Sequence, residues 1–524
     1  MKKDTSTMII KKTEYEALKA EITELNQKVE WFMEQFRLAQ HHRFGASTEK
    51  SEYDQISIFN EAEVYADMNV SEPELTEIES HFRKRKRTAK ERLPEDLPVE
   101  VVEHELPKEE QLCPECGGDM HVMGRETRRE LVIIPASAKI REHVRKVYAC
   151  RDCEKDSCGV PIKKAAVSEP VIKGSFASPE AVAYIMTQKF VMGSPLYRQE
   201  QEFVRGGINL SRQTMSNWLL RATEDWLEPI YDALHEILCG GEVLHADETT
   251  LQVLREPGKT AQQKSYMWLY RTSRYNRQGV SKVNPIVLYE YQPDRKAKRP
   301  AEFLKDFKGY LHADGYEAYH TLPEKIVVVG CWAHVRRKFS DALKILSEKD
   351  RKGSDTALGK QYCDRLFELE RSFSDMTPEE RYEKRQELSK PIASEFFAWA
   401  ATLSDRPKTL LVSAANYAIS QRNYLEQYLS DGRLEISNNR AERSIKPFVI
   451  DRKNFLFANT PRGAKASAIM FSIIETAKEN GLNPYKYLTH IFKNAPNWDL
   501  KNNPIMFEFI LPHLLSDSYK SSLV

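Results

Sequence analysis

Residues 243–253 read Val-Leu-His-Ala-Asp-Glu-Thr-Thr-Leu-Gln-Val and follow a pair of glycines. Apolar and β-branched residues at both ends, after a glycine turn, predict a β-strand. The middle of this strand carries His245, Asp247 and Glu248, and a carboxylate in a buried strand is costly unless it is paired or binds a metal ion. Taken alone, a salt-bridged or edge-exposed acid is the commoner explanation. A catalytic role therefore requires partner residues elsewhere in the chain.

Four more strands are expected after this one. They span Tyr266–Thr272, Ile286–Tyr291, Tyr310–Tyr316 and Ile326–Cys331, with helices at Ala301–Phe307 and His334–Leu346. The fully apolar segment 326–331 suits a central strand. Three strands, a crossover helix and two further strands form the layout of an RNase H-like mixed sheet, in which acids at neighbouring strand ends share metal ions.

The first and fourth strands both carry the tripeptide His-Ala-Asp, which puts Asp247 and Asp314 at equivalent positions. If the strands are adjacent, these acids lie close enough to bind Mg²⁺, which takes a few carboxylates together with water and substrate phosphate. Two such ions activate the attacking oxygen and stabilise the leaving oxygen in phosphoryl transfer. Side chains alternate along a strand, so Glu248 points away from Asp247 and is expected to be structural.

A third carboxylate is expected from a helix that follows the sheet. Residues 348–432 come first and predict a charge-rich, all-α insertion. In the next helix Asn438, Glu442 and Lys446 share one face. Glu442 is the candidate metal ligand, and Asn438 and Lys446 are candidates for contact with DNA phosphate. A capping-box role for Glu442 is the alternative, and Pro447 predicts that this helix is short or kinked.

Two Cys-x-x-Cys pairs precede the sheet. They are Cys113 with Cys116 and Cys150 with Cys153, separated by 33 residues. Two such pairs supply the four thiolates of a tetrahedral Zn²⁺ site, and the segments Leu131–Ile134 and Val144–Tyr148 resemble the strands of a zinc ribbon. Cys158 follows and leaves the identity of the fourth thiolate open. Four thiolates leave no open coordination position, so this zinc is expected to be structural.

A helix-turn-helix candidate lies between the cysteines and the sheet. Helices are expected over 179–190, Leu196–Val204 and Ser211–Ala222, with Ser211 as the N-cap of the last. The last two are joined by a turn at 206–209 that contains two glycines. Arg212, Gln213 and Asn217 then point outward near the start of the recognition helix. An αα-hairpin that never contacts DNA is the alternative.

The N-terminal region combines a helix with opposed charge blocks. Apolar residues recur with 3-4 spacing from Tyr15 to Phe36, which predicts either a coiled coil or a helix packed on its own protein. Glu61–Ser80 holds seven acids and no Lys or Arg, whereas Arg83–Arg92 holds seven basic residues and one acid. The two blocks cancel in the net charge of +1. Their separation favours a polyanion-binding face beside an acidic linker.

The composition indicates several soluble domains, with 524 residues of which 41% are hydrophobic. No apolar run approaches the roughly 18 residues that span a bilayer, and the N-terminus lacks the apolar segment of a secretory signal. We therefore expect a cytoplasmic protein with no membrane partner, in which the eight cysteines do not form a disulfide framework.

Several of these motifs occur together in one known family. Asn438-Asn439-x-x-Glu442-Arg443, the two His-Ala-Asp strands and Cys331-Trp-Ala-His-x-Arg-Arg337 resemble the DDE transposases of the insertion sequence 66 family. The resemblance extends to Arg43–Lys50, the cysteine pairs and the helix-turn-helix, and so covers most of the chain as far as about residue 515.

The resemblance implies a catalytic triad of Asp247, Asp314 and Glu442 that holds two Mg²⁺ ions, with Mn²⁺ as a substitute. It also implies two in-line displacements at phosphorus. Water cleaves at the end of the element and exposes a 3′-OH, and that hydroxyl attacks target DNA without a covalent protein intermediate.

The implied partners are double-stranded DNA at the element ends and the target, further copies of the chain in a homodimer or larger synaptic complex, and accessory proteins encoded by the same element. Residues 440–465 hold seven basic and two acidic residues, which suits a nucleic-acid groove containing Arg443 and Lys446. His334, Arg336 and Arg337 are candidates for a DNA phosphate clamp, with helix packing as the alternative.

The expected architecture is a multidomain α+β protein. Its parts are a helical coiled-coil segment (1–66), a charged linker (67–107), a zinc ribbon (108–165), a helix-turn-helix region (170–230), an RNase H-like mixed α/β catalytic domain (240–470) with an all-α insertion (348–432), and a small C-terminal helical domain (471–524).

Two other functions fit parts of this pattern. One is a metal-dependent DNA nuclease on the same fold, and the other is a non-catalytic DNA-binding regulator, which leaves the three acids unexplained.

Overall fold

The computed structural model describes residues 19, 137–149, 162–275 and 285–523, apart from 405, 408, 499, 501, 502 and 516. The chain divides into two compact units, residues 46–165 and the remainder. In the smaller unit β1 (Val147–Ala149) pairs antiparallel with β2 (Ile162–Lys164). The strand predicted at 144–148 is thus confirmed in part. The strand predicted at 131–134, the zinc ligands, the charged linker and all of the coiled-coil segment except the helical Lys19 lie outside the described residues.

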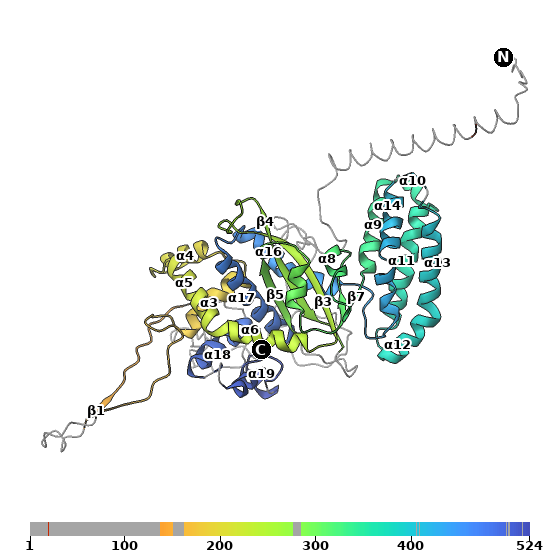
Figure 1. Cartoon of the computed structure of the whole chain (residues 1–524). Helices are drawn as coiled ribbons and strands as arrows, with labels where there is room; N and C mark the ends of the chain where they lie inside the picture. The colour runs from red at the N-terminus through yellow and green to blue at the C-terminus, as the bar shows by residue number, and fades with distance from the viewer. Residues whose placement is uncertain are drawn as a thin grey trace, which may run out of the picture. The chain divides into compact units, whose positions relative to one another are not determined.

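The larger unit is built on a five-stranded mixed sheet (Figure 1). Its strands are β3 (Val243–Gln252), β4 (Lys264–Thr272), β5 (Val287–Gln292), β6 (Gly309–His312) and β7 (Ile326–Val329). The order is β5-β4-β3-β6-β7, with β3, β4 and β5 antiparallel and β6 and β7 parallel to β3. The central strand is therefore β3, the one that the sequence singled out.

The prediction that the apolar segment 326–331 is central is wrong, because β7 is an edge strand. Its edge is covered by α15 (Arg422–Leu425), and the backbone N–H of Gly330 donates a 2.9 Å hydrogen bond to the carbonyl oxygen of Tyr424. Three of the four residues of β7 are buried without a second neighbouring strand, and Val327 is 36% exposed, so an apolar segment does not by itself identify a central strand.

Both ends of β6 are fixed by identifiable residues. The strand begins at Gly309, where φ is 149° and any Cβ would collide with the carbonyl group of Glu242. It ends at His312, because the Oδ1 atom of Asp314 accepts a 3.0 Å hydrogen bond from the backbone N–H of Tyr316 and turns the chain. The strand predicted to reach Tyr316 is therefore too long, and Asp314 lies just beyond the strand end.

Helices cover both faces of the sheet. On one face lies α16 (Asn439–Phe455), and on the other lie α6 (Glu228–Cys239), α7 (Lys298–Phe303) and α8 (Glu317–His320). The helix α17 (Pro461–Glu479) runs along the edge strand β5, and its Ser472 and Thr476 hydroxyls bond the backbone of that strand. Arg271 of β4 donates hydrogen bonds to Ser444 of α16 and Glu479 of α17. On the opposite face Tyr270 stacks on Phe303 of α7, with 3.9 Å between ring centroids. The alternation of side chains along the strands therefore separates the two layers.

The helix α16 continues through Pro447 to Phe455. Of the two alternatives predicted from the sequence, a short or a kinked helix, the short helix is therefore wrong. Proline removes one helical hydrogen bond. The neighbouring Ile445 and Phe448 are 7% and 0% exposed, and both belong to the core that lies against the sheet. Burial of this apolar stripe offsets the lost bond and carries the helix past the proline.

The predicted all-α insertion is helical. It contains α10 (Glu348–Arg351), α11 (Asp355–Ser372), α12 (Pro378–Lys384), the π-helical turn Arg385–Ser389, α13 (Lys390–Ala401), α14 (Leu410–Ser420), α15 and the 3-10 turn Gln427–Leu429. With α9 (Trp332–Ile345), the helices α11, α13 and α14 run side by side (Figure 1). Trp332, Phe339 and Phe396 fill the core between them. The start of α9 therefore has a rigid support.

The helices of the predicted helix-turn-helix are confirmed. They are α3 (Pro179–Phe190), α4 (Leu196–Arg205) and α5 (Arg212–Ala222), and the Oγ atom of Ser211 accepts a hydrogen bond from the N–H of Thr214, as expected of an N-cap. A π-helical turn at Thr223–Leu227 leads into α6.

The C-terminal part contains α18 (Pro484–Asn494), 3-10 turns at Ala495–Asn497 and Pro504–Phe509, and α19 (Asp517–Leu523). Residues of α3, α17 and α18 share one hydrophobic core. The predicted boundary between catalytic and C-terminal domains, at 470/471, falls inside the continuous helix α17. Within the described ranges, no helix has the length and apolarity to cross a membrane.

Candidate active site

The strands that carry the repeated tripeptide are adjacent, as predicted, with Asp247 within β3 and Asp314 just beyond the end of β6. The parallel register of β3 and β6 pairs His245 with His312, and each aspartate lies two residues further on. Asp247 and Asp314 are half-buried, and the Oδ1 atom of Asp247 accepts a 2.8 Å hydrogen bond from the N–H of Glu248. No donor from the described residues bonds the Oδ2 atom of either aspartate, which leaves both atoms available to a cation.

The electrostatics at Asp247 favour a cation. Burial raises the pKa of Asp247 well above its usual value, and repulsion from Glu248, Asp314 and Glu442 raises it further. The hydrogen bond from the backbone of Glu248 opposes this effect only in part. A divalent cation beside Asp247 and Asp314 would relieve the repulsion, so the carboxylates present fit such an ion.

Glu442, in the first turn of α16, is held by residues of α9. Its Oε1 atom lies 3.1 Å from the Nε2 atom of His334, and its Oε2 atom accepts a 3.1 Å hydrogen bond from Arg337. Burial raises the pKa of Glu442, but the hydrogen bond and charge of His334 and the charge of Arg337 outweigh it and lower the pKa to about 2. The alternative of a capping box is wrong, because this carboxylate contacts α9 and not its own helix end.

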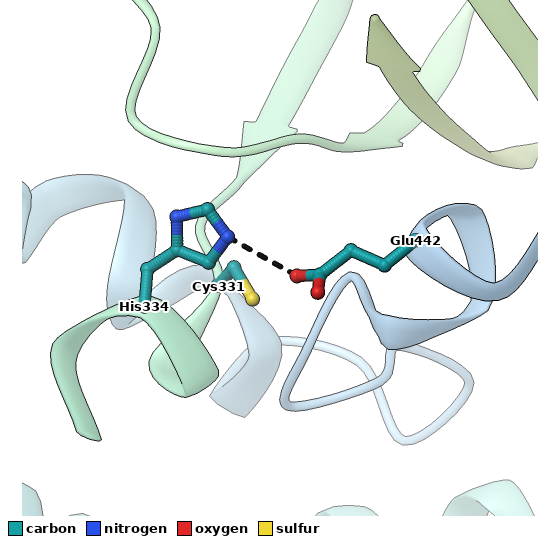
Figure 2. Close-up of side chains that lie close together, drawn as sticks. All are labelled: Cys331, His334 and Glu442. Atoms are coloured by element: carbon teal, nitrogen blue, oxygen red, sulfur yellow. Dashed lines mark hydrogen bonds and ion pairs between the residues drawn. The ribbon is translucent and has the colours of Figure 1, made fainter. Parts of the chain in front are cut away.

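The predicted triad is only partly assembled. Asp247 senses the charge of Glu442. Among the described residues, however, one group of three candidate metal ligands has all its ligand atoms within 4.8 Å of one another, and it is Cys331, His334 and Glu442 (Figure 2). The structure therefore brings the strands of the two aspartates together but places the glutamate among residues of α9.

Asn438 is buried at 2% exposure, which contradicts its predicted contact with DNA. Its Nδ2 atom donates a 2.7 Å hydrogen bond to the carbonyl oxygen of Ala246, and its Oδ1 atom lies 3.0 Å from the Nδ1 atom of His245. Its backbone N–H donates to the Sγ atom of Cys331 at 3.1 Å. An amide with both ends engaged in the interior cannot reach phosphate, so Asn438 joins α16 to β3.

Two histidines that the sequence reasoning left without a role form part of this junction. The rings of His245 and His312 are fully buried and stacked, with centroids 4.3 Å apart and planes 12° apart. Burial lowers the pKa of both well below the usual value, so both are neutral. The Nε2 atom of His312 accepts a hydrogen bond from the N–H of Glu435. The repeated His-Ala-Asp tripeptide could have predicted this pair. When two strands with the same motif pair in register, the same side chain of each motif lies beside its counterpart.

Glu248 points to the opposite face of the sheet from Asp247, as expected. Its side chain is 2% exposed, forms an ion pair with Arg295, and accepts a 2.5 Å hydrogen bond from the hydroxyl of Tyr319 on α8. These contacts satisfy its charge, which agrees with a structural role.

Much of the basic groove predicted at 440–465 is engaged within the protein. Arg440, Arg452, Arg462 and Lys465 bond Glu435, Thr250, Glu224 and Glu228. Arg443, Lys446 and Lys453 are exposed on α16 and form no ion pair with another described residue. Spacings of three and seven residues put them on one side of the helix. The surface available to DNA is therefore narrower than the sequence suggested.

Of the other residues predicted to contact DNA, some are engaged within the protein and others are exposed to solvent. Arg336 forms a 2.6 Å ion pair with Asp364 of α11, which agrees with the alternative of helix packing. Arg212, Gln213 and Asn217 are exposed on α5, as predicted, although the guanidinium of Arg212 also lies over the ring of Tyr197.

Four family models match successive parts of the chain. The model described as "Transposase IS66 family" matches residues 174–466, "zinc-finger binding domain of transposase IS66" matches 110–154, "Transposase C of IS166 homeodomain" matches 31–102, and "IS66 C-terminal element" matches 472–503. The zinc-finger match includes all four predicted zinc ligands. The match at 31–102 overlaps the segment predicted to be a linker, and that assignment stays a prediction.

Relatives of similar length occur in Sinorhizobium fredii (strain NBRC 101917 / NGR234). Uncharacterized protein y4jD is 30% identical over 431 residues, which cover 80% of this chain and 81% of the relative. Uncharacterized protein y4qI is 33% identical over 414 residues, which cover 76% and 72%. The chain is thus similar to these proteins over most of its length.

Proposed function

Because this chain belongs to the IS66 family of transposases, we propose that it cuts DNA at the ends of a mobile element and joins the resulting 3′-OH ends to target DNA. The observation that carries the proposal is the pair of aspartates that each follow, by two residues, the paired histidines of the adjacent parallel strands β3 and β6. The strand order β5-β4-β3-β6-β7, antiparallel then parallel, supports an RNase H-like catalytic domain.

The proposed metal ligands are Asp247, Asp314 and Glu442. Their oxygen donors are those that Mg²⁺ or Mn²⁺ prefers. When bound, two such ions supply activation of the attacking oxygen and stabilisation of the leaving oxygen. The hydrogen bonds from the backbone of Glu248 and Tyr316 fix one oxygen of each aspartate, so these two carboxylates are oriented before DNA arrives.

Completion of the triad requires a change of partner at Glu442. The carboxylate must leave His334 and Arg337 to join Asp247 and Asp314. Arg337 has a side chain 55% exposed, so its guanidinium can exchange the carboxylate for a DNA phosphate. Binding of a DNA phosphate by Arg337 would in this way release Glu442 and so favour assembly of the three carboxylates.

The remaining proposed surfaces bind DNA or other protein chains. Arg443 and Lys446 of α16 would contact phosphates near the reacting strand, and α5 would read the element ends. The zinc-finger match supports a Zn²⁺ ion, for which we propose Cys113, Cys116, Cys150 and Cys153 as structural ligands. The N-terminal helix would join copies in a synaptic complex, with which accessory proteins of the element would associate.

The test is a joining assay with purified protein, Mg²⁺, pre-cut element ends and plasmid DNA. Asp247→Asn, Asp314→Asn and Glu442→Gln should each lower joining more than about 100-fold, because direct ligands matter more than the residues that support them. Binding of the ends should survive. Glu317→Gln, which removes an exposed carboxylate three residues from Asp314, is the matched control.

Each rival predicts a different result. Cleavage without joining would support a nuclease, and DNA binding with no reaction would support a regulator. Joining that persists in any of the three triad variants would refute the assignment of the site.

A further inference from the structure

A second group of possible metal ligands lies beside the proposed triad (Figure 2). Cys331 is the N-cap of α9, His334 lies in the first turn of α9, and Glu442 lies in the first turn of α16. Their ligand atoms are all within 4.8 Å of one another, and His334 Nε2 and Glu442 Oε1 are 3.1 Å apart. Tetrahedral zinc separates nitrogen, oxygen and sulfur ligands by about 3.3–3.6 Å. Side-chain movements of about 1 Å would thus complete the coordination.

The surroundings of Cys331 suit a metal-bound thiolate. Burial and the charge of Glu442 raise the pKa of the Cys331 thiol to about 12, and nearby backbone N–H groups oppose this rise in part. The N–H of Asn438 donates a 3.1 Å hydrogen bond to Sγ. A bound cation would supply the positive charge that the buried thiolate needs. The first N–H groups of a helix have no partner within the helix and favour negative charge. Hydrogen bonds of this kind stabilise the deprotonated sulfur that a metal ion requires.

The other two ligands close the site toward solvent. The side chains of His334 and Glu442 are 25% and 24% exposed, whereas the Cys331 residue is 3% exposed. An ion can therefore enter past the imidazole and carboxylate and reach the sulfur beneath them. Arg337 holds the Oε2 atom of Glu442, which leaves Oε1 directed at the imidazole and able to bind an ion through one oxygen.

We propose that Cys331, His334 and Glu442 form a binding site for a thiophilic divalent cation, Zn²⁺, with the fourth position open to water. Thiolate and imidazole select zinc over magnesium, whereas the carboxylates of Asp247 and Asp314 select magnesium. Binding displaces the proton of the thiol into solvent, and the hydrogen on Nε2 of His334, which now faces Glu442, moves to Nδ1 or is released as well. Because Glu442 belongs to both sets, zinc holds it on α9 and competes with assembly of the triad. The competition rests on the proposed function, but the binding of zinc does not.

Zinc binding is measured directly on the full-length protein, without DNA. In a Cys113→Ser background, which removes a proposed zinc-finger ligand, the remaining zinc should be about one ion per chain. It should be lost on adding His334→Gln, a partly exposed position at which the protein can fold, or Cys331→Ser. Cys363→Ser is the matched control, because Cys363 is fully buried within α11 and belongs to no such group among the described residues. Zinc that is absent from the background protein, or unchanged by His334→Gln, would overturn the site.

The competition is measured by adding Zn²⁺ to the Mg²⁺-dependent joining reaction. Each variant is normalised to its own rate with Mg²⁺ alone. The zinc concentration that gives half inhibition should rise about 10-fold or more in Cys331→Ser and stay unchanged in Cys363→Ser. Equal inhibition of both variants would overturn the competition. A wild-type protein that fails to join DNA with Mg²⁺ alone would instead refute the proposed function, and the zinc content would still decide the binding site.

Discussion

Replacement of Asn438 by alanine should cost about 2–6 kcal/mol of folding free energy. The side chain forms two buried hydrogen bonds, to the carbonyl oxygen of Ala246 and to the imidazole of His245. Alanine leaves both partners without a hydrogen bond in a fully buried position, and each unsatisfied group costs about 1–3 kcal/mol. The hydrogen bond from the backbone N–H of residue 438 to Cys331 is retained in the variant. Only the two hydrogen bonds of the side-chain amide are lost.

Urea unfolding followed by tryptophan fluorescence measures this cost. Trp268 in β4 and Trp332 in α9 are fully buried and report on the sheet and on the helix beside the site. The midpoint should fall without a change in the slope. The control is Asn439→Ala, a partly exposed neighbour of the same type, which should change stability by less than about 0.5 kcal/mol. If the two variants unfold at the same midpoint, the junction between α16 and β3 does not contribute as described.

Three further experiments test other parts of the site. Burial and neighbouring acids raise the pKa of Asp247 in the folded protein. The folded protein therefore holds this proton more tightly than the unfolded chain does, and its stability falls as the pH rises above the ordinary carboxylate range. Asp247→Asn should therefore raise the melting temperature of metal-free protein at neutral pH and not below about pH 4, and a lower melting temperature at neutral pH would contradict this. Arg443→Ala and Lys446→Ala should each lower the salt dependence of DNA binding by about one counterion, whereas Lys465→Ala, paired with Glu228, should have a smaller effect; equal slopes would argue against the α16 surface. Cys113→Ser should remove about one zinc per chain in metal analysis, and an unchanged content would refute the zinc finger.

The sequence identified the elements of the site because repeated motifs obey simple geometry. Two His-Ala-Asp tripeptides on parallel strands must lie side by side when the strands pair in register, and they do. The same reasoning separated Asp247 from Glu248, since alternation along a strand does not depend on the rest of the fold.

The incorrect predictions came from features that depend on distant contacts. The side chain of Asn438 was expected to contact DNA phosphate, but a buried carbonyl and a buried imidazole supply its partners. Pro447 was expected to shorten or kink its helix, yet the packing of Phe448 carries the helix past the proline. The proximity of Glu442 to Cys331 and His334 depends on two helix ends that meet only in the folded chain, so the spacing of Cys331 and His334 in the sequence does not reveal the third residue.

The contact between Arg337 and Glu442 has a thermodynamic consequence. If DNA phosphate takes Arg337 and so releases Glu442 for the metal ions, DNA and metal are coupled ligands. Linkage then requires each to tighten the binding of the other by the same factor. Magnesium added without element ends would bind weakly, and DNA bound without magnesium would dissociate sooner. A transposase with this coupling stays inactive until DNA and metal are both bound, because neither alone shifts Glu442 completely.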